Sequence, residues 1–335
     1  MRAVIYRENG PSNVLQLVDR PVPEPGPGEV RVKMHLSAVN PTDWKGRATR
    51  PVAFGEQVPN EDGSGVVDAV GAGVDAKRVG ERVWVWLAAH QRPQGTAQEY
   101  LVIPAERAVA LPAAASFELG ADIGVPFLTA HRTLTVHEAG PAQLAPGTLD
   151  GRTVLVAGGA GAVGNAAIQL ARWAGATVLT SVSSAEKAAL ATAAGAHHVI
   201  NYRTQDLVAE VRRLVPDGAD IVVEVSTANA GPDVDLLAAN GVVAMYAGTA
   251  GQEVTVPLRP AMAINARWQY VLLYTIPDAA KSAAVAAVTD AAAAGAIGVG
   301  DSVGLPLHRF PLEQTAAAHD AVEGGAVGKV LIEIG

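Results

Sequence analysis

The sequence contains no cysteine, and this absence excludes several kinds of site. Without thiols the chain forms neither disulfides nor thiolate metal sites, and it has no cysteine nucleophile. Basic residues are also scarce, since 25 Lys and Arg face 33 Asp and Glu, and the formal net charge is −8. Nucleic acid is therefore not an expected partner, because its phosphates require a positive surface.

Long apolar runs are missing as well. No run reaches the roughly 18 residues that would suggest a membrane span, and the N-terminus lacks the apolar core of a signal peptide. We therefore expect a cytoplasmic protein without a membrane partner. What is present is a chain of 335 residues, of which 49% are hydrophobic and 17% charged. These values predict a globular protein of two domains.

The pattern of short apolar runs changes along the chain. Residues 1–123 alternate Val, Ile and Leu between Gly and Pro, which predicts a mainly β domain. Residues 124–276 repeat the order strand, turn and helix, which predicts a parallel sheet covered by helices on both faces. Residues 277–335 end in a helix, a Gly-rich turn and a strand, and we expect them to return to the first domain. The predicted fold class is α/β.

One glycine-rich segment predicts a binding site. Gly159, Gly161 and Gly164 form the pattern G-x-G-x-x-G, between the apolar strand "TVLVA" and the helix that begins at Val163. Glycines permit a tight turn and let backbone N–H groups approach a pyrophosphate, and the helix N-terminus adds partial positive charge. Glycines in this pattern between a strand and a helix are typical of a dinucleotide-binding site, so the segment predicts a bound dinucleotide.

The end of the second strand of this domain predicts which dinucleotide binds. An NAD site usually has an acid there, about 20 residues past the loop, which binds the ribose 2′-hydroxyl. This chain has "TSVSSAEK", in which Ser181 and Ser183 offer hydroxyls and Lys187 a cation. These groups suit the 2′-phosphate of NADPH, which a carboxylate would repel. Glu186 is the alternative acid, but its position is typical of the first turn of a helix.

Several long segments resemble one protein family. They include "PVPEPGPGEVRVKMHLSAVNPTDWKGR", "GVVDAVGAGVDAKRVGERVW", "VLVAGGAGAVG" and "GKVLIEI", and they follow the family's order over nearly the whole chain. The chain resembles the zinc-free quinone oxidoreductase group, which includes zeta-crystallin, of the medium-chain dehydrogenase/reductase superfamily. The resemblance implies a GroES-like β-rich catalytic domain, an inserted Rossmann domain that binds NADPH, and a cleft between the two.

The same resemblance implies roles for single residues. Residues 158–164 would cradle the pyrophosphate; Ser183, Lys187 and Tyr202 would surround the adenosine and its 2′-phosphate; and Lys329 would close the cleft. Plainer alternatives stay open: Tyr202 as a strand-end aromatic, Thr129 as a satisfied helix hydroxyl, Lys329 as solvated surface. The expected cofactor-binding residues are Asn40, Thr129, Gly158, Gly159, Gly161, Ala162, Val163, Gly164, Ser181, Ser183, Lys187, Tyr202, Tyr246, Ala247, Gly248 and Lys329.

The chain departs from the zinc-dependent relatives at the metal site. It has none of their cysteines, and it reads "PNEDGSG" where the metal-binding branch reads G-H-E. His197 and His198 are adjacent, so on a strand they would point to opposite faces. We therefore expect no bound metal.

The absence of zinc favours some acceptors over others. Alcohol oxidation needs a Lewis acid or a proton relay, whereas a quinone or an α,β-unsaturated carbonyl spreads the incoming charge onto an oxygen. The preferred function is an NADPH:quinone reductase. The alternatives are an NADPH-dependent C=C reductase of enones or enoyl thioesters, and a cofactor-binding protein with little turnover.

Two loops are expected to meet the substrate. Asn40, Asp43 and Trp44 lie on one of them, and Trp86 and His90 on the other. His90 is an alternative proton donor, but proton supply by solvent is preferred, and no catalytic residue is assigned. Finally, the apolar segment 266–277 predicts either a strand that pairs across a homodimer or an interior strand of the monomer.

Overall fold

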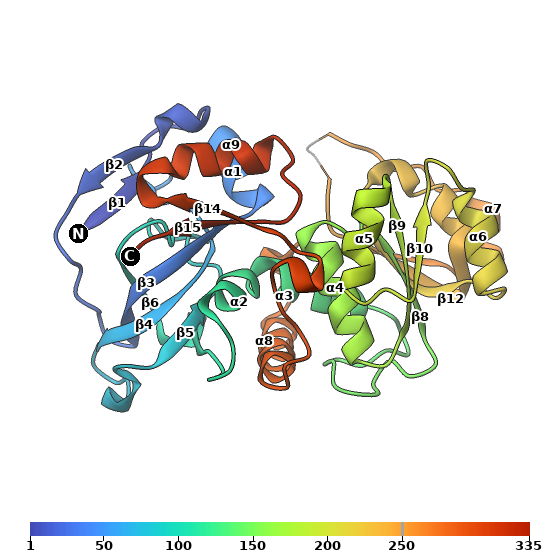
Figure 1. Cartoon of the computed structure of the whole chain (residues 1–335), viewed down its shortest axis with the longest axis horizontal. Coiled ribbons are helices and arrows are strands. Elements are labelled where there is room, and N and C mark those ends of the chain that lie inside the picture. Colours follow the sequence, from blue (N-terminus) through green and yellow to red (C-terminus); the bar gives the residue numbers. More distant parts are fainter. Residues whose placement is uncertain (249–250) are drawn as a thin grey trace. The chain divides into compact units, whose positions relative to one another are not determined.

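The computed structural model describes residues 1–248 and 251–335, and the chain forms two compact units (Figure 1). Unit 1 comprises residues 1–125 and 306–335, and unit 2 comprises residues 126–305. Unit 1 is rich in β-strands, and unit 2 contains a parallel sheet whose strands alternate with helices. The predicted α/β fold class is confirmed.

Unit 1 is built on a seven-stranded sheet in the order β14-β15-β3-β4-β5-β7, with β6 paired to β3. Inward-facing Val, Ile and Leu side chains alternate along these strands and form one apolar core. The strands of unit 1 are β1 (Arg2–Ile5), β2 (Gln16–Asp19), β3 (Glu29–Val39), β4 (Asp62–Val70), β5 (Arg82–Val85), β6 (Tyr100–Pro104), β7 (Ala108–Ala110), β14 (Leu307–Pro311) and β15 (Lys329–Glu333). Of these, β1 and β2 pair with each other in a separate two-stranded sheet. Its helices are α1 (Pro41–Thr49), α2 (Phe117–Asp122) and α9 (Thr315–Glu323).

Unit 2 contains a six-stranded parallel sheet in the order β10-β9-β8-β11-β12-β13. The predicted alternation of strand and helix is confirmed here. Its strands are β8 (Thr153–Ala157), β9 (Thr177–Val182), β10 (His198–Asn201), β11 (Ala219–Glu224), β12 (Leu237–Met245) and β13 (Arg267–Tyr270). Its helices are α3 (Val125–Leu134), α4 (Ala162–Trp173), α5 (Ala185–Ala193), α6 (Leu207–Leu214), α7 (Leu258–Ala263) and α8 (Asp278–Ala293).

The chain returns to unit 1 at Pro306, later than the expected residue 277. The segment that contains α8 stays in unit 2 because side chains of α4 bind it. Asn165 Nδ2 donates to the Val303 carbonyl at 2.7 Å, and the Gln169 amide exchanges hydrogen bonds with the Gly298 backbone. Both amide side chains are buried, so these bonds replace solvent and fix the segment.

The segment expected to form a strand at 266–277 contains β13, which is shorter. This strand pairs with β12 in parallel and ends the sheet within the chain. Tyr270 is 57% exposed and Leu272, which follows it, is 55% exposed. The interior-strand alternative is therefore wrong for this segment.

Within the described residues, no helix combines the length and the apolar character needed to span a membrane.

Candidate functional site

The glycine-rich segment forms the turn between β8 and α4, as the sequence predicts. Gly158 has φ +70°, and its N–H donates to the Ser181 carbonyl at 3.0 Å. The Gly161 N–H donates back to the Gly158 carbonyl at 3.0 Å, and Gly161 is the N-cap of α4. The turn therefore brings the bare backbone of residues 158–161 to the N-terminus of a helix of 12 residues.

The three glycines of the G-x-G-x-x-G pattern serve two different purposes. A Cβ atom on Gly159 would lie 2.1 Å from Thr180 Oγ1, and one on Gly164 would lie 2.4 Å from the Gly158 carbonyl oxygen. Both positions thus need glycine for packing. A Cβ atom on Gly161 would come no closer than 3.5 Å to any neighbour, and its φ of −82° suits any residue. The fold does not require glycine there, whereas an anion bound at the helix N-terminus does. The loop fits a dinucleotide pyrophosphate.

The end of β9 carries hydroxyls and a cation, as expected. Lys187 Nζ donates to Ser183 Oγ at 3.3 Å, while Glu186 is exposed in the first turn of α5. A hydrogen bond with Ser184 lowers the pKa of Glu186, so its carboxylate serves the helix N-terminus. Tyr202 is 50% exposed in the turn after β10, and its N–H donates to the Val182 carbonyl. Ser183, Lys187 and Tyr202 thus lie around the same strand end.

The remaining expected cofactor residues of unit 2 are placed as follows. Thr129 is buried on α3, and Ser181 is buried within β9. Residues 246–248 follow β12, and the Tyr246 N–H donates to the Glu224 carbonyl at 3.2 Å. Burial raises the pKa of the Tyr246 hydroxyl, which keeps it neutral. Ala162 and Val163 are half-buried in the first turn of α4.

Lys329 lies in the interior of unit 1 and is 1% exposed. Its Nζ donates to Asn40 Oδ1 at 2.8 Å and lies 3.3 Å from Asp122 Oδ1. The solvated alternative for Lys329 is therefore wrong. Its role in closing the cleft stays a prediction.

Asn40 is held from both sides. Its Oδ1 accepts from Lys329, and its Nδ2 donates to Asp62 Oδ2 at 2.7 Å. Asp62 Oδ2 also accepts from the Val125 N–H at 2.8 Å. Burial raises the pKa of Asp62 to about 6, against the opposing effect of Lys329. The orientation of the Asn40 amide is thus fixed, since its oxygen faces the cation and its nitrogen faces the carboxylate.

Asp43 occupies the first turn of α1 and is buried. Its Oδ2 accepts from the Asn40 N–H at 2.6 Å, and its Oδ1 accepts from the Glu61 N–H at 3.2 Å. The first bond belongs to a capping box and holds the start of the helix. Burial raises the pKa of the Asp43 carboxyl to about 7. Asp43 therefore joins α1 to the segment that precedes β4.

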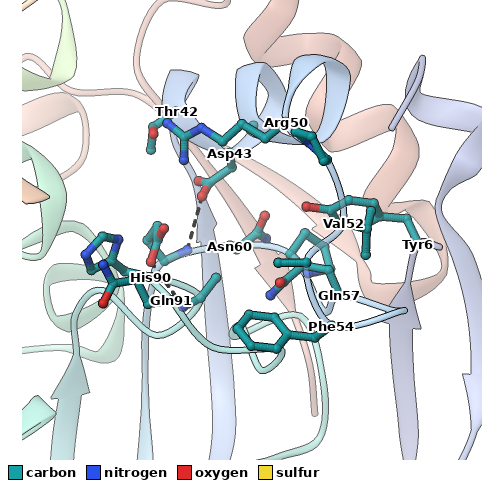
Figure 2. A pocket seen from close by; sticks show the side chains of 16 residues that line it. Tyr6, Thr42, Asp43, Arg50, Val52, Phe54, Gln57, Asn60, His90 and Gln91 are labelled. Atoms are coloured by element: carbon teal, nitrogen blue, oxygen red, sulfur yellow. Dashed lines mark hydrogen bonds between the residues drawn. The ribbon is translucent and has the colours of Figure 1, made fainter. Parts of the chain in front are cut away.

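A cavity of about 180 Å³ opens beside this segment within unit 1 (Figure 2). Of the residues that the sequence predicts for the substrate, Asp43 and His90 line it, whereas Asn40, Trp44 and Trp86 do not. Asn40 is buried behind it in the polar network, and Trp86 is 9% exposed. The other lining residues are Tyr6, Thr42, Gly46, Arg50, Pro51, Val52, Ala53, Phe54, Gln57, Pro59, Asn60, Glu61, Ala89 and Gln91.

Asn60 and Glu61 are site residues that sequence reasoning missed. Asn60 has φ +77°, a conformation that Asn adopts more readily than most residues. Its Nδ2 donates to Ser37 Oγ at 2.9 Å, and its Oδ1 lies 2.9 Å from His319 Nε2 on α9. The signal in the sequence was the polar run "NED" at the start of a buried strand.

No group of three or more His, Cys, Asp or Glu side chains in residues 1–248 and 251–335 is arranged to hold a metal ion. The expected absence of zinc stays a prediction.

Gly161→Ala tests whether the loop holds a dinucleotide. Because the added Cβ atom would make only ordinary van der Waals contact, with the Gly158 carbonyl oxygen at 3.5 Å, the melting temperature of the protein without cofactor should change little. The methyl group should weaken NADPH binding at least about tenfold, which corresponds to about 1.4 kcal/mol, when Kd is measured by fluorescence titration. An unchanged Kd would remove this turn from the binding site. Gly231→Ala, whose added Cβ atom would likewise come no closer than 3.6 Å to a neighbour, serves as the matched control.

Two family models match the chain. The model described as "Alcohol dehydrogenase GroES-like domain" matches residues 26–113, and the model described as "Zinc-binding dehydrogenase" matches residues 162–290. Human quinone oxidoreductase is 30% identical over 344 residues, which cover 99% of this chain and 97% of that protein. A 2-haloacrylate reductase of a Burkholderia species is 30% identical over 352 residues, which cover 99% and 98%.

Solved structures agree over the whole chain. An NAD-dependent alcohol dehydrogenase has a TM-score of 0.84 and is 31% identical, with 100% of both chains covered. The mycobacterial protein Rv1454c complexed with NADPH has a TM-score of 0.80 and is 29% identical, with 99% of this chain and 100% of that chain covered. Together with the glycine-rich turn and the two matched domains, these findings show that the chain belongs to the quinone oxidoreductase group of the medium-chain dehydrogenase/reductase superfamily.

Proposed function

We propose that this protein is an NADPH-dependent reductase that transfers hydride to a quinone without zinc. The observation that carries the proposal is the pair formed by Lys187 Nζ and Ser183 Oγ at the end of β9. A cation and a hydroxyl at this position suit a 2′-phosphate, whereas an NAD site has a carboxylate there. The NADPH complex of the related mycobacterial protein supports the choice.

Each unit supplies part of what the reaction needs. When bound, NADPH supplies the hydride. In unit 2, residues 158–164 offer backbone N–H groups and a helix N-terminus to the pyrophosphate. In unit 1, the cavity beside Asp43 and Glu61 offers hydrogen-bonding groups to an acceptor. A quinone needs no Lewis acid, because its conjugation carries the incoming charge to an oxygen that such groups stabilise.

The alternative is an NADPH-dependent C=C reductase. The related 2-haloacrylate reductase of Burkholderia favours it, since that name describes reduction of an activated double bond. The same cofactor site and cavity serve both reactions. A cofactor-binding protein with little turnover is the second alternative, because binding does not require catalysis.

The test compares acceptors and cofactors directly. Purified protein is mixed with NADPH or NADH, and the loss of absorbance is followed with 1,4-benzoquinone and with a linear enone. We expect NADPH oxidation by the quinone, at a much higher rate than with NADH. Turnover of the enone alone would assign the protein to the C=C reductases. Binding of NADPH without turnover of either acceptor would favour the binding-protein alternative.

Lys187→Ala tests the choice of cofactor. Loss of the ammonium removes a charge-assisted contact with the 2′-phosphate, so KM for NADPH should rise at least about tenfold while KM for NADH stays unchanged. Steady-state kinetics with both cofactors measures this, and exposed Lys77→Ala is the control. An equal rise for both cofactors would contradict a 2′-phosphate contact, because it would place Lys187 against a part of the dinucleotide that NADH and NADPH share.

We further propose a homodimer that forms through β13. The strand ends its sheet within the chain, and exposed apolar side chains lie on and near it. Such an edge invites pairing with another strand. The side chains are Leu258, Met262, Tyr270 and Leu272.

The double variant Tyr270→Asp with Leu272→Asp tests the dimer. Because the new carboxylates would be buried against like charges at a two-fold interface, the variant should sediment as a monomer, whereas the wild type should sediment as a dimer in sedimentation equilibrium. Wild-type protein that sediments as a monomer would overturn the proposal. Leu17→Asp, an exposed position in unit 1, should leave the mass unchanged.

The other partners and the location remain as the sequence predicts them. We propose a small-molecule acceptor, no nucleic acid and no membrane partner, and a cytoplasmic location. The negative net charge and the absence of cysteine support these statements.

A further inference from the structure

Glu61 is a buried acid among the residues that line the cavity of unit 1. It is 5% exposed and lies directly before β4. Its Oε2 accepts from the Ala89 N–H at 3.0 Å, and its backbone carbonyl accepts from the Ala88 N–H at 2.9 Å. The side chain is therefore held by the loop that forms another wall of the cavity.

The neighbouring carboxyl groups have better partners for a negative charge. Asp43 accepts two backbone N–H groups, from Asn40 and Glu61. Hydrogen bonds of this kind stabilise the charged form of a carboxyl group.

Asp62 and Asp122 are stabilised in a different way. Asp62 accepts from the Asn40 amide and the Val125 N–H, and the ammonium of Lys329 acts on it as well. Asp122 forms an ion pair with Lys329. Glu61 accepts a single backbone N–H, so of these acids it is the one most suited to carry a proton.

Burial and the neighbouring acids favour the protonated form of Glu61. Burial, followed by the charges of Asp43 and Asp62, raises the pKa of Glu61 well above its ordinary value. The positive charge of Arg50 acts in the opposite direction, and Tyr6 and His90 are the other titratable groups that line the cavity.

We propose that Glu61 is the proton donor of the reduction, and this inference rests on the proposed function. The acceptor gains a hydride from NADPH, which leaves as NADP⁺, and the negative charge develops on the acceptor oxygen. The Glu61 carboxyl group breaks its O–H bond and forms the new O–H bond on that oxygen. The resulting Glu61 carboxylate takes a proton from water before the next turnover. This step replaces direct protonation by solvent.

Glu61→Gln is the variant that tests the step. Glutamine keeps the shape of the side chain, and its oxygen can accept from the Ala89 N–H, but it has no proton to transfer. We expect kcat with NADPH and benzoquinone to fall about 100-fold at neutral pH, while KM and the Kd for NADPH stay unchanged. Exposed Glu106→Gln is the matched control.

The pH dependence gives a second readout. In the wild type, kcat should fall as rising pH removes the proton from Glu61, because the carboxylate cannot donate. In Glu61→Gln this alkaline decline should be absent. A merely structural role for Glu61 would lower kcat without removing the decline.

Infrared spectroscopy gives a readout that does not depend on activity. The difference spectrum of wild type minus Glu61→Gln, recorded without cofactor at neutral pH, should contain the carbonyl stretch of a protonated carboxyl group. Absence of that band would overturn the inference. If the wild type is active and Glu61→Gln has the same kcat and pH profile, the inference is also overturned. Wild-type protein that reduces neither the quinone nor the enone would overturn the proposed function, and this inference with it.

Discussion

The buried ammonium of Lys329 is the interaction on which the polar interior of unit 1 depends. A buried carboxylate is costly unless it is paired, and Lys329 forms an ion pair with Asp122 and orients Asn40 toward Asp62. Lys329 opens β15, which pairs with β3 only because the chain returns to unit 1 at Pro306. The topology therefore supplies the cation that lets the acids be buried.

Lys329 stabilises the charged forms of the acids that lie near it. The positive charge of Lys329 opposes the rise in the pKa of Asp62 and of Asp122. Asp43 accepts hydrogen bonds from two backbone N–H groups near the start of α1. In our proposal it is Glu61, which accepts from the Ala89 N–H at the wall of the cavity, that carries the proton. Unit 2 contributes a different kind of chemistry. Its glycine-rich turn offers an anion backbone N–H groups and the partial positive charge of a helix N-terminus, with almost no side chains. Binding of an anion and supply of a proton are thus built into separate units.

Local features could be predicted from the sequence, and long-range ones could not. The turn at residues 158–164 was predicted because its glycines, the preceding strand and the following helix are neighbours in the chain. The assignment of residues 277–305 to unit 1 was wrong, because the bonds from Asn165 and Gln169 join segments more than a hundred residues apart. The burial of Lys329 and the role of Glu61 were missed for the same reason, since the partners of each are set by the fold.

A crystal structure with NADP⁺ and a quinone analogue that cannot be reduced would test the account most directly. The account predicts the pyrophosphate within hydrogen-bonding distance of the backbone of residues 158–164 and the 2′-phosphate beside Lys187. It also predicts an oxygen of the analogue within hydrogen-bonding distance of the Glu61 carboxyl group. A dinucleotide bound away from the glycine-rich turn, or an analogue bound outside the cavity that Asp43 and Glu61 line, would contradict it.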